Sequence, residues 1–363
     1  MNAMIDGKTA VGAGRLGARG LAAAMAIGLA WASASFASSP DDGSAGPAVD
    51  RSAGSSVLRT MLTPEAERAI ERGVRYLVEA QGEGGGWGGE YPGASTGAAL
   101  TALLAAGHLP GEDAEGRAMR RGLAWLRARG EANAGYLGTG NKGMYEHALA
   151  TLALAELAGE SDEGRIVGVL RAAVKVIVDA QNDAGGWRYK PDSGDADVSV
   201  TAMQVVALAS ASEAGLAVPT EVMAKARRYL GACFDEEVGG FRYQPNAKEP
   251  ALARTAAGTA AMMFLAGPDD PRVRAGLAFI EERGSRAPGT DYFFYGLYYA
   301  AQCMYRAGDE RHARWYPAMR DALVDSQADD GSWSGSQGGA ALSTAMAVVM
   351  LGAEYRYLPI YQR

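Results

Sequence analysis

Hydrophobic positions divide most of the chain into two kinds of segment, which alternate from about residue 64 onward. In the first kind, apolar residues recur three and four positions apart and polar residues fill the rest. This is the pattern of a helix that buries one face and exposes the other. The six stripes are Ile70/Val74/Leu77, Leu123/Leu126, Leu170/Val174/Ile177, Met223/Tyr229/Leu230, Val273/Leu277/Ile280 and Met319/Leu323.

Segments of the second kind are apolar throughout and rich in alanine and other small residues. A helix that is apolar on most of its faces must be buried on most of them. These segments therefore predict a second, enclosed set of helices. They are Ser95–Ala106, Tyr145–Leu157, Ser199–Ala211, Ala253–Leu265, Tyr292–Tyr305 and Leu342–Leu351.

A glycine-rich turn followed by an aromatic residue connects the two kinds of segment and recurs roughly every 50 residues. The aromatic residues are Trp87, Tyr136, Trp187, Phe241, Tyr292 and Trp333. Six such hairpins give twelve helices in two concentric layers. Because no end unit has a clearly polar outer face, the hairpins are expected to close on themselves. The sequence predicts an all-α fold, an (α/α)6 toroid over residues 63–363.

Short polar and glycine segments indicate where these helices begin and end. Glycines such as Gly185 and Gly239 can take positive φ and stop an outer helix. Ser95, Ser199 and Ser343 each precede an alanine-rich run and are predicted to cap its free N–H groups. The aromatic tail from residue 355 to residue 361 is expected to pack across the seam between the first and last units.

The N-terminal 37 residues have the features of an export signal. Lys8, Arg15 and Arg19 precede an apolar run from Leu21 to Trp31, and small residues follow it up to a small-x-small site at residues 35–37. A disordered tail and a permanent membrane anchor are the alternatives. Residues 38–62 are rich in Ser, Gly, Pro and Asp and predict a disordered linker. The protein is therefore expected to be exported, to the periplasm or beyond the cell.

The charge and the cysteine and histidine content limit which partners, disulfides and metal sites the sequence predicts. The net charge is −7, and no basic run lies outside the first 20 residues, which argues against a nucleic-acid partner. Cys233 and Cys303 lie in apolar helical context and are interpreted as buried free thiols, with a single disulfide as the alternative. The three histidines lie in different units, so no zinc site and no cofactor are predicted.

Three turns carry a further pattern, a glutamine six residues before the tryptophan. Gln181-x5-Trp187 and Gln327-x5-Trp333, and less fully Gln81-x5-Trp87, resemble the QW repeats of the prenyltransferase and squalene-oxidase repeat superfamily. The resemblance covers roughly residues 64–355 and is nearest to single-barrel, exported bacterial members. It implies a barrel with a central apolar cavity, an isoprenoid or other lipid ligand, and contact with a membrane surface. The glutamine and tryptophan themselves are interpreted as structural clamps between hairpins.

Class II cyclases of this superfamily protonate an alkene with the middle aspartate of an Asp-x-Asp-Asp-Thr-Ala motif. The corresponding segment here runs from Asp195 to Ala202. Aligning Thr201 with the motif's threonine puts Ser199 at the catalytic aspartate, so the acid is missing. Aligning Asp195 with the first aspartate keeps Asp197 as the acid. Asp197 and Asp195 are the catalytic candidates, and a helix N-cap is the competing interpretation of Asp197.

Aromatic residues are the main candidates for substrate contact, because their faces can stabilise a carbocation. Residues 292–299 hold six aromatics, which either fill the core or line the cavity. The candidate substrate-binding residues are Tyr145, Glu146, Trp187, Tyr189, Tyr243, Tyr292, Tyr295 and Tyr299.

Two other functions are open. Exported (α/α)6 barrels also serve as carbohydrate-active enzymes, which need paired carboxylates in an open cleft. Polar residues of the loops and inner-helix starts are expected to gather at one mouth of the ring, and they are Glu146, Arg188, Tyr189, Asp195, Asp197, Arg242, Tyr243, Arg254 and Asp291. The Arg188-Tyr189 and Arg242-Tyr243 pairs either bind an anion or form contacts within the hairpins. The third function is a non-catalytic scaffold that binds a protein or glycan at its rim.

Overall fold

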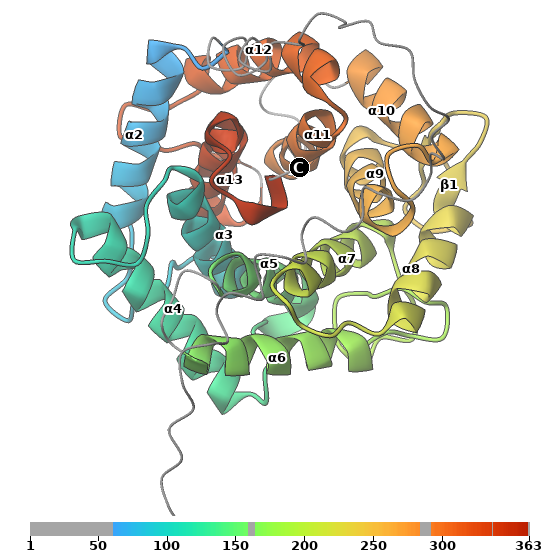
Figure 1. Ribbon diagram of the computed structural model, residues 1–363, viewed down its shortest axis with the longest axis horizontal. Helices are drawn as coiled ribbons and strands as arrows, with labels where there is room; N and C mark the ends of the chain where they lie inside the picture. Colours follow the sequence, from blue (N-terminus) through green and yellow to red (C-terminus); the bar gives the residue numbers. More distant parts are fainter. Residues whose placement is uncertain (1–60, 159–163, 284–291, 336, 362–363) are drawn as a thin grey trace, which may run out of the picture. The chain divides into compact units, whose positions relative to one another are not determined.

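The computed structural model describes residues 61–158, 164–283, 292–335 and 337–361. The predicted signal peptide, and the predicted linker except for Met61 and Leu62, lie outside this range. The described residues all belong to one compact unit. Its helices are arranged as one ring inside another (Figure 1).

The described residues form twelve α-helices, and outer and inner helices alternate along the chain. The outer helices are α2 (Pro64–Glu79), α4 (Ala114–Ala132), α6 (Gly164–Asp179), α8 (Thr220–Cys233), α10 (Pro271–Arg283) and α12 (Asp309–Asp325). The inner helices are α3 (Pro92–Ala105), α5 (Gly143–Glu156), α7 (Val198–Glu213), α9 (Leu252–Ala266), α11 (Phe293–Arg306) and α13 (Gly339–Gly352).

Both rings close. Each inner helix packs against the next inner helix, and α13 packs against α3. In the outer ring, α12 packs against α2. Every predicted inner helix is present within a few residues of its expected bounds. The predicted (α/α)6 toroid is therefore confirmed.

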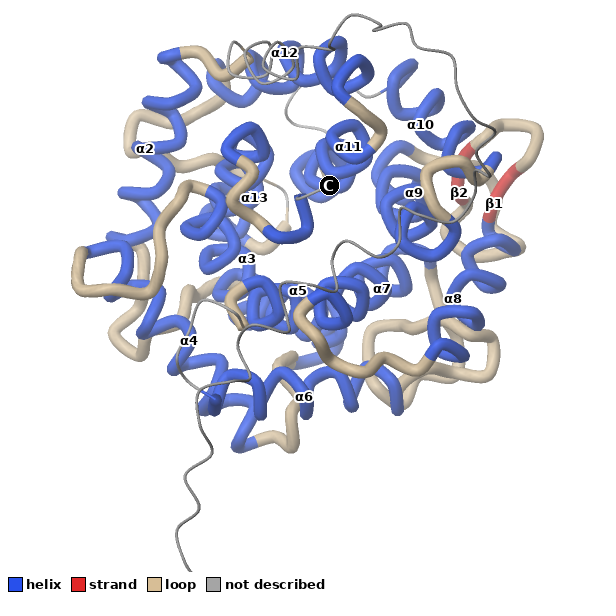
Figure 2. The backbone as a smooth tube through the Cα atoms, in the orientation of Figure 1, coloured by secondary structure: helices blue, strands red, loops and turns tan. Residues whose placement is uncertain are grey.

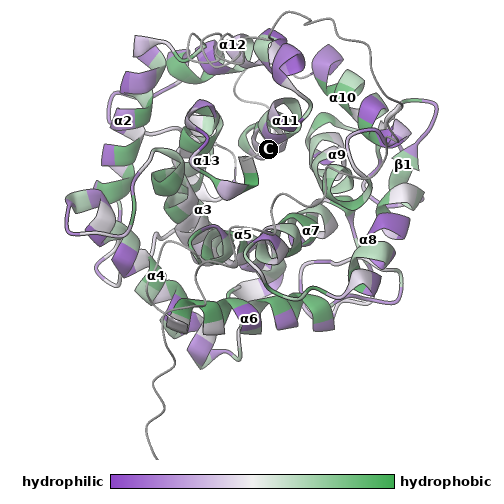
Figure 3. Cartoon of the chain, viewed as in Figure 1, coloured by the Kyte–Doolittle hydropathy of each residue, from purple (hydrophilic) through white to green (hydrophobic). Residues whose placement is uncertain are grey.

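The two layers differ in burial as the hydrophobic pattern predicts. Inner helices such as α3 and α7 are buried on nearly every face, whereas α2 and α4 bury one stripe and expose the other. Hydrophobic colour accordingly gathers on the inner ring, and hydrophilic residues mark the outside (Figure 3). Small residues let the inner helices lie close together: a Cβ on Gly97 would stand 2.6 Å from the Leu149 carbonyl oxygen of α5.

Short elements complete the connections. Two two-residue strands, β1 (Phe234–Asp235) and β2 (Gly240–Phe241), pair antiparallel in the turn after α8 (Figure 2). The 3-10 helix η2 (Gly140–Lys142) precedes α5, and η3 (Ala353–Tyr355) and η4 (Pro359–Tyr361) follow α13. No described helix is both long enough and apolar enough to span a bilayer.

The glutamine–tryptophan turns act as clamps. The Gln181 amide donates to the Gly185 carbonyl at 2.9 Å and to the Val222 carbonyl of α8 at 2.8 Å. The Trp187 indole N–H donates to the Ile177 carbonyl at 2.7 Å. Each turn is thus tied to its own outer helix and to the next one. Gln81 with Trp87 and Gln327 with Trp333 make the same bonds.

The Gln327 clamp also closes the ring, because its second acceptor is the Ala69 carbonyl of α2 at 2.9 Å. This bond from a side-chain amide to a backbone carbonyl in the first helix joins the last unit to the first. The clamp interpretation of these residues agrees with this geometry.

The predicted serine caps are wrong. Ser95, Ser199 and Ser343 all lie inside their helices rather than before them. Pro92 opens α3 earlier, since its fixed φ suits a first helical position. Asp197 caps α7 instead, because its carboxylate accepts the Val200 N–H at 2.9 Å. Gly185 has the predicted positive φ, 90°, but α6 already ends at Asp179, so this glycine shapes the turn and does not stop the helix.

The C-terminal tail was expected to pack across the seam between the first and last units, and it also contacts other inner helices. Ile360 donates its N–H to the Glu156 carboxylate of α5 at 3.1 Å, and its carbonyl accepts from Arg306 of α11 at 2.9 Å. Both partners stand at the C-terminal ends of inner helices, and η4 lies inside the outline of the ring (Figure 1). The tail therefore covers that end of the ring. Cys233 and Cys303 are buried free thiols.

Candidate functional site

A cavity of about 380 Å³ lies at the opposite end of the ring, where the inner helices begin. Each inner helix contributes the same repeat position to its wall. These six residues are Ala94, Tyr145, Ser199, Ala253, Tyr295 and Leu342. The position is set by a shared bond two residues later, where a threonine accepts the N–H of the preceding turn's aromatic residue in four units.

Aromatic and aliphatic side chains form most of the wall. They include Tyr91, Leu149, Tyr189, Met203, Tyr243, Phe293, Phe294 and Met346 beside the residues above. The charged residues that the structure places in the wall are Lys142 and Arg254. Within the described part of the chain, the wall contains no aspartate or glutamate. The cavity is therefore apolar with a cationic contribution.

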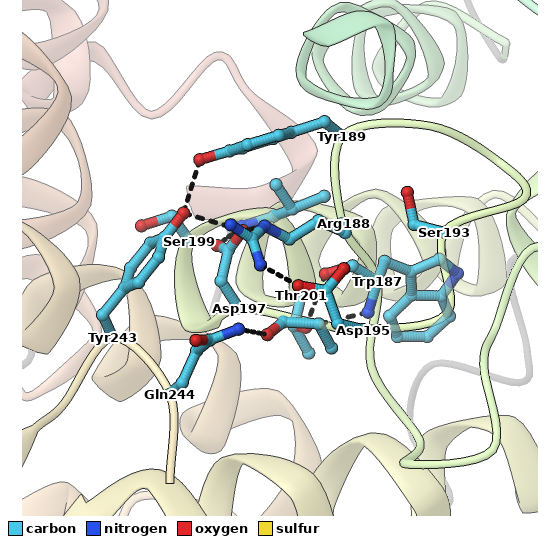
Figure 4. A network of polar contacts seen from close by, with 12 residues as sticks. Trp187, Arg188, Tyr189, Ser193, Asp195, Asp197, Ser199, Thr201, Tyr243 and Gln244 are labelled. Atoms are coloured by element: carbon cyan, nitrogen blue, oxygen red, sulfur yellow. Dashed lines mark hydrogen bonds and ion pairs between the residues drawn. The ribbon is translucent and has the colours of Figure 1, made fainter. Parts of the chain in front are cut away.

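Three tyrosines form one side of the cavity. Tyr145 stacks on Tyr189, with ring centroids 5.8 Å apart, and the Tyr189 hydroxyl lies 2.5 Å from the Tyr243 hydroxyl. Tyr243 in turn donates to the Asp197 carboxylate at 3.2 Å (Figure 4). Burial raises the pKa of Tyr145 well above its usual value. The Tyr145 hydroxyl is therefore a neutral group at physiological pH.

Asp197 lies behind this tyrosine layer and does not line the cavity. Its carboxylate is fully buried, caps α7, and stands 3.1 Å from the Arg188 Nε atom. Burial raises its pKa to about 6, while the Val200 N–H, Arg188 and Tyr243 each pull it down. The geometry is that of a helix cap held in an ion pair, which was the competing interpretation of this residue.

Arg188 joins the two catalytic candidates. Its guanidinium pairs with Asp195, an exposed residue outside the cavity wall, as well as with Asp197. It also lies over the Tyr189 and Tyr243 rings, 4.7 Å and 5.5 Å from their centroids. The arginine–tyrosine pair thus makes contacts within the protein. Arg242 likewise pairs with Asp235 of its own turn.

The remaining aromatic candidates separate into two groups. Tyr295 and Tyr292 line the cavity, and Tyr295 donates its hydroxyl proton to the Ser199 carbonyl at 3.3 Å. Tyr299 packs against Tyr295 but is buried away from the wall. Trp187 is buried in its turn and also lies outside the wall.

Glu146 joins loops and does not line the cavity. Its carboxylate accepts the Gly93 N–H at 2.7 Å and the Thr139 N–H at 2.9 Å. It thereby ties the start of α3 to the loop before α5. Asp291 lies outside the described residues.

His147 also has a structural role. His147 accepts the Leu137 N–H and bonds the Ala173 carbonyl, both at 3.1 Å. Over the residues that the structure covers, no group of three or more metal-ligating side chains comes together.

Arg254 lies at the mouth of the ring as predicted, whereas Lys142 was not among the predicted residues. Arg254 lies in the first turn of α9 and donates to the Glu249 carbonyl at 2.7 Å. Lys142 stands just before α5, 3.4 Å from the Tyr91 hydroxyl and 6.0 Å from its ring centroid. Their positions in the repeat could have indicated this, because Arg254 follows the wall residue Ala253 and Lys142 lies three positions before the wall residue Tyr145.

Comparison with known proteins finds solved structures with a similar fold. No family model and no curated protein matches the sequence. Among solved structures, the GH76A α-1,6-mannanase of Salegentibacter sp. HEL1_6 is similar, with a TM-score of 0.62 and 10% identity over 80% of this chain and 99% of the mannanase. The type II terpene cyclase MstE from Scytonema has a TM-score of 0.56 and 16% identity over 82% of this chain and 100% of the cyclase.

A protein from Actinoplanes is similar at a TM-score of 0.57 and 18% identity, over 80% of this chain and 99% of its own. Identities this low show a shared fold and no more. The mannanase and the cyclase both have the (α/α)6 toroid fold seen here. The chemistry must therefore be argued from the cavity.

Proposed function

We propose that this protein binds an isoprenoid or another lipid in its central cavity. The observation that supports it is the wall: aromatic and aliphatic side chains from all six inner helices around about 380 Å³. That volume lies within the usual range of small-molecule sites, and apolar lining with few polar groups is their usual composition. The terpene cyclase MstE, a fold neighbour, has been solved with geranylgeranyl dihydroxybenzoate.

The proposal is binding without alkene protonation. Ser199, which takes the place of the catalytic aspartate in one alignment with the cyclase motif, lines the cavity, and a hydroxyl is far too weak an acid for that step. Asp197, the acid of the other alignment, is held by Arg188 and the α7 N-terminus behind Tyr243. Cyclase-like shape is thus combined with a degenerate acid motif.

A carbohydrate-active enzyme is the second candidate, because the mannanase shares the fold. Glycoside hydrolysis uses two carboxylates that flank the scissile bond. The described cavity wall offers neither, and its aromatic and aliphatic surface suits a hydrocarbon chain better than a sugar. The lipid proposal is therefore preferred. Export through the predicted signal peptide, and contact with a membrane surface that supplies the lipid, belong to this proposal.

Lipid extraction and direct binding test the proposal. Purified protein is extracted with organic solvent and analysed by mass spectrometry, and binding of radiolabelled geranylgeraniol is measured. Ala253→Phe fills the cavity from its wall, whereas Ala128→Phe places the same ring on the exposed face of α4. We expect the first variant to lose binding at least tenfold and the second to bind as wild type. Absence of both co-purified lipid and binding would refute the proposal, and release of sugar from α-1,6-mannan would favour the second candidate.

A further inference from the structure

The two cations in the cavity wall have no counter-ion there. Among the described residues, no carboxylate forms an ion pair with Arg254 or Lys142, whereas Arg188 and Arg242 near the same end of the ring each have one. Arg254 is partly buried beside the apolar cavity, so its lack of an ionic partner carries a desolvation cost, whereas Lys142 is exposed. A ligand that brings a negative charge would offset this cost.

Arg254 has hydrogen-bonding capacity left over. One terminal nitrogen donates to the Glu249 carbonyl at 2.7 Å, but the Nε atom is buried and has no partner among the described residues. Burial also lowers the pKa of the guanidinium, the direction expected when a cation lacks compensation. Arginine presents donors in a planar fork that matches carboxylate and phosphate oxygens.

The backbone adds to the positive potential. All six inner helices contribute their first turns to this one cavity, so their positive dipole ends converge on it. Of the inner helices, α7 is capped by Asp197, and α3 has the Glu146 carboxylate on its Gly93 N–H. The other five N-cap residues make no side-chain cap bond.

We propose that the ligand is an amphiphile with an anionic head group, a carboxylate or a phosphate, which Arg254 and Lys142 bind while its hydrocarbon chain fills the aromatic cavity. This inference rests on the proposed function and specifies the chemistry of its ligand. The aliphatic wall residues, such as Leu149, Met203 and Met346, contact the chain.

Three probes with the same twenty-carbon chain test the head group: geranylgeraniol, geranylgeranoic acid and geranylgeranyl monophosphate. Their affinities are measured by isothermal titration calorimetry at low and high salt. We expect at least one anionic probe to bind roughly tenfold or more tightly than the alcohol, since a hydrogen bond to a charged group is worth that much. Its advantage should shrink at high salt. The anionic probe with the higher affinity identifies the head group.

Matched variants locate the effect. Arg254→Gln and Lys142→Gln should each weaken the anionic probe roughly tenfold more than they weaken the alcohol. Arg228→Gln and Lys175→Gln remove the same charges from exposed outer-helix positions and should change neither affinity. Measurable binding of geranylgeraniol also shows that each variant is folded.

The outcomes distinguish the two proposals. Equal affinity for all three probes, or an anion preference that survives both cavity substitutions, would overturn the head-group inference and leave the lipid-binding proposal standing. Failure of every probe to bind would count against the lipid-binding proposal itself.

Discussion

Substitution of Glu156 tests how this buried carboxyl group holds the C-terminal tail. This residue ends α5, is 2% exposed, and accepts hydrogen bonds from the Ser210 hydroxyl at 2.5 Å and the Ile360 N–H at 3.1 Å. Burial raises the pKa of its carboxyl from 4.5 to about 7, and the charge on Glu213 adds to the rise. The folded protein therefore favours the protonated form.

The pKa difference sets the size of the effect. A shift of about 2.5 units, at about 1.4 kcal/mol per unit, corresponds to about 3 kcal/mol. Because the folded pKa is higher than the unfolded one, this stability is complete below pH 4.5 and is lost as the pH rises through 7. In Glu156→Gln the side chain stays neutral. Its carbonyl can accept from Ile360 and its amide can donate to Ser210.

Urea denaturation of both proteins at several pH values measures the difference. We expect the free energy of unfolding of Glu156→Gln to equal that of wild type near pH 4 and to exceed it by up to about 3 kcal/mol near pH 8.5. Glu221→Gln on the exposed side of α8 should follow wild type at every pH. A Glu156→Gln curve parallel to wild type from pH 4 to 8.5 would show that burial does not perturb this carboxyl.

Three further substitutions test the framework. Gln181→Ala removes two backbone-directed hydrogen bonds and should lower the free energy of unfolding by about 2 kcal/mol in urea melts; no change would contradict the clamp. Gly186→Ala places a methyl group 2.6–2.9 Å from its neighbours and should cost about 1–3 kcal/mol by the same measurement, whereas Gly194→Ala meets nothing within 4 Å and should be nearly neutral. Burial lowers the pKa of His147 to about 4, so wild type should lose up to about 3 kcal/mol as the pH falls from 6.5 to 4. Four other units have threonine at this position. The His147→Thr variant should therefore lose less stability over that pH range, and a loss equal to that of wild type would show that His147 is not the group responsible.

The fold could be predicted because its determinants are local and repeated. Each hairpin carries the same stripe, turn and apolar helix, so errors at one unit are corrected by the others. Helix starts were harder, since the expected serine caps competed with Pro92 and Asp197. The first residue of α3 is set by the fixed φ of proline, and the cap of α7 is set by a carboxylate that accepts a backbone N–H. In the sequence, both signals are less conspicuous than the alanine-rich runs.

The cavity was only partly predictable. Tyr145, Tyr189, Tyr243, Tyr292 and Tyr295 line it, as the aromatic pattern indicated. Other candidates on the same inner helices do not line it, because residues around a helix point in different directions.

Glu146 and Tyr299 illustrate this. Both are buried, Glu146 bonds the start of α3, and Tyr299 packs against Tyr295 of its own helix. The importance of Arg254 and Lys142 depends on which carboxylates lie near them. That proximity is a property of the closed ring and cannot be read along the chain.

Photo-crosslinking tests the central claim that the ring encloses a lipid site. A geranylgeranyl analogue with a diazirine on its chain is irradiated with the protein, and labelled peptides are mapped by mass spectrometry. We expect labels on inner-helix residues of the cavity wall, such as Tyr145, Met203 and Met346, and their loss in Ala253→Phe. Labels confined to the outer helices, or labelling unaffected by that substitution, would contradict it.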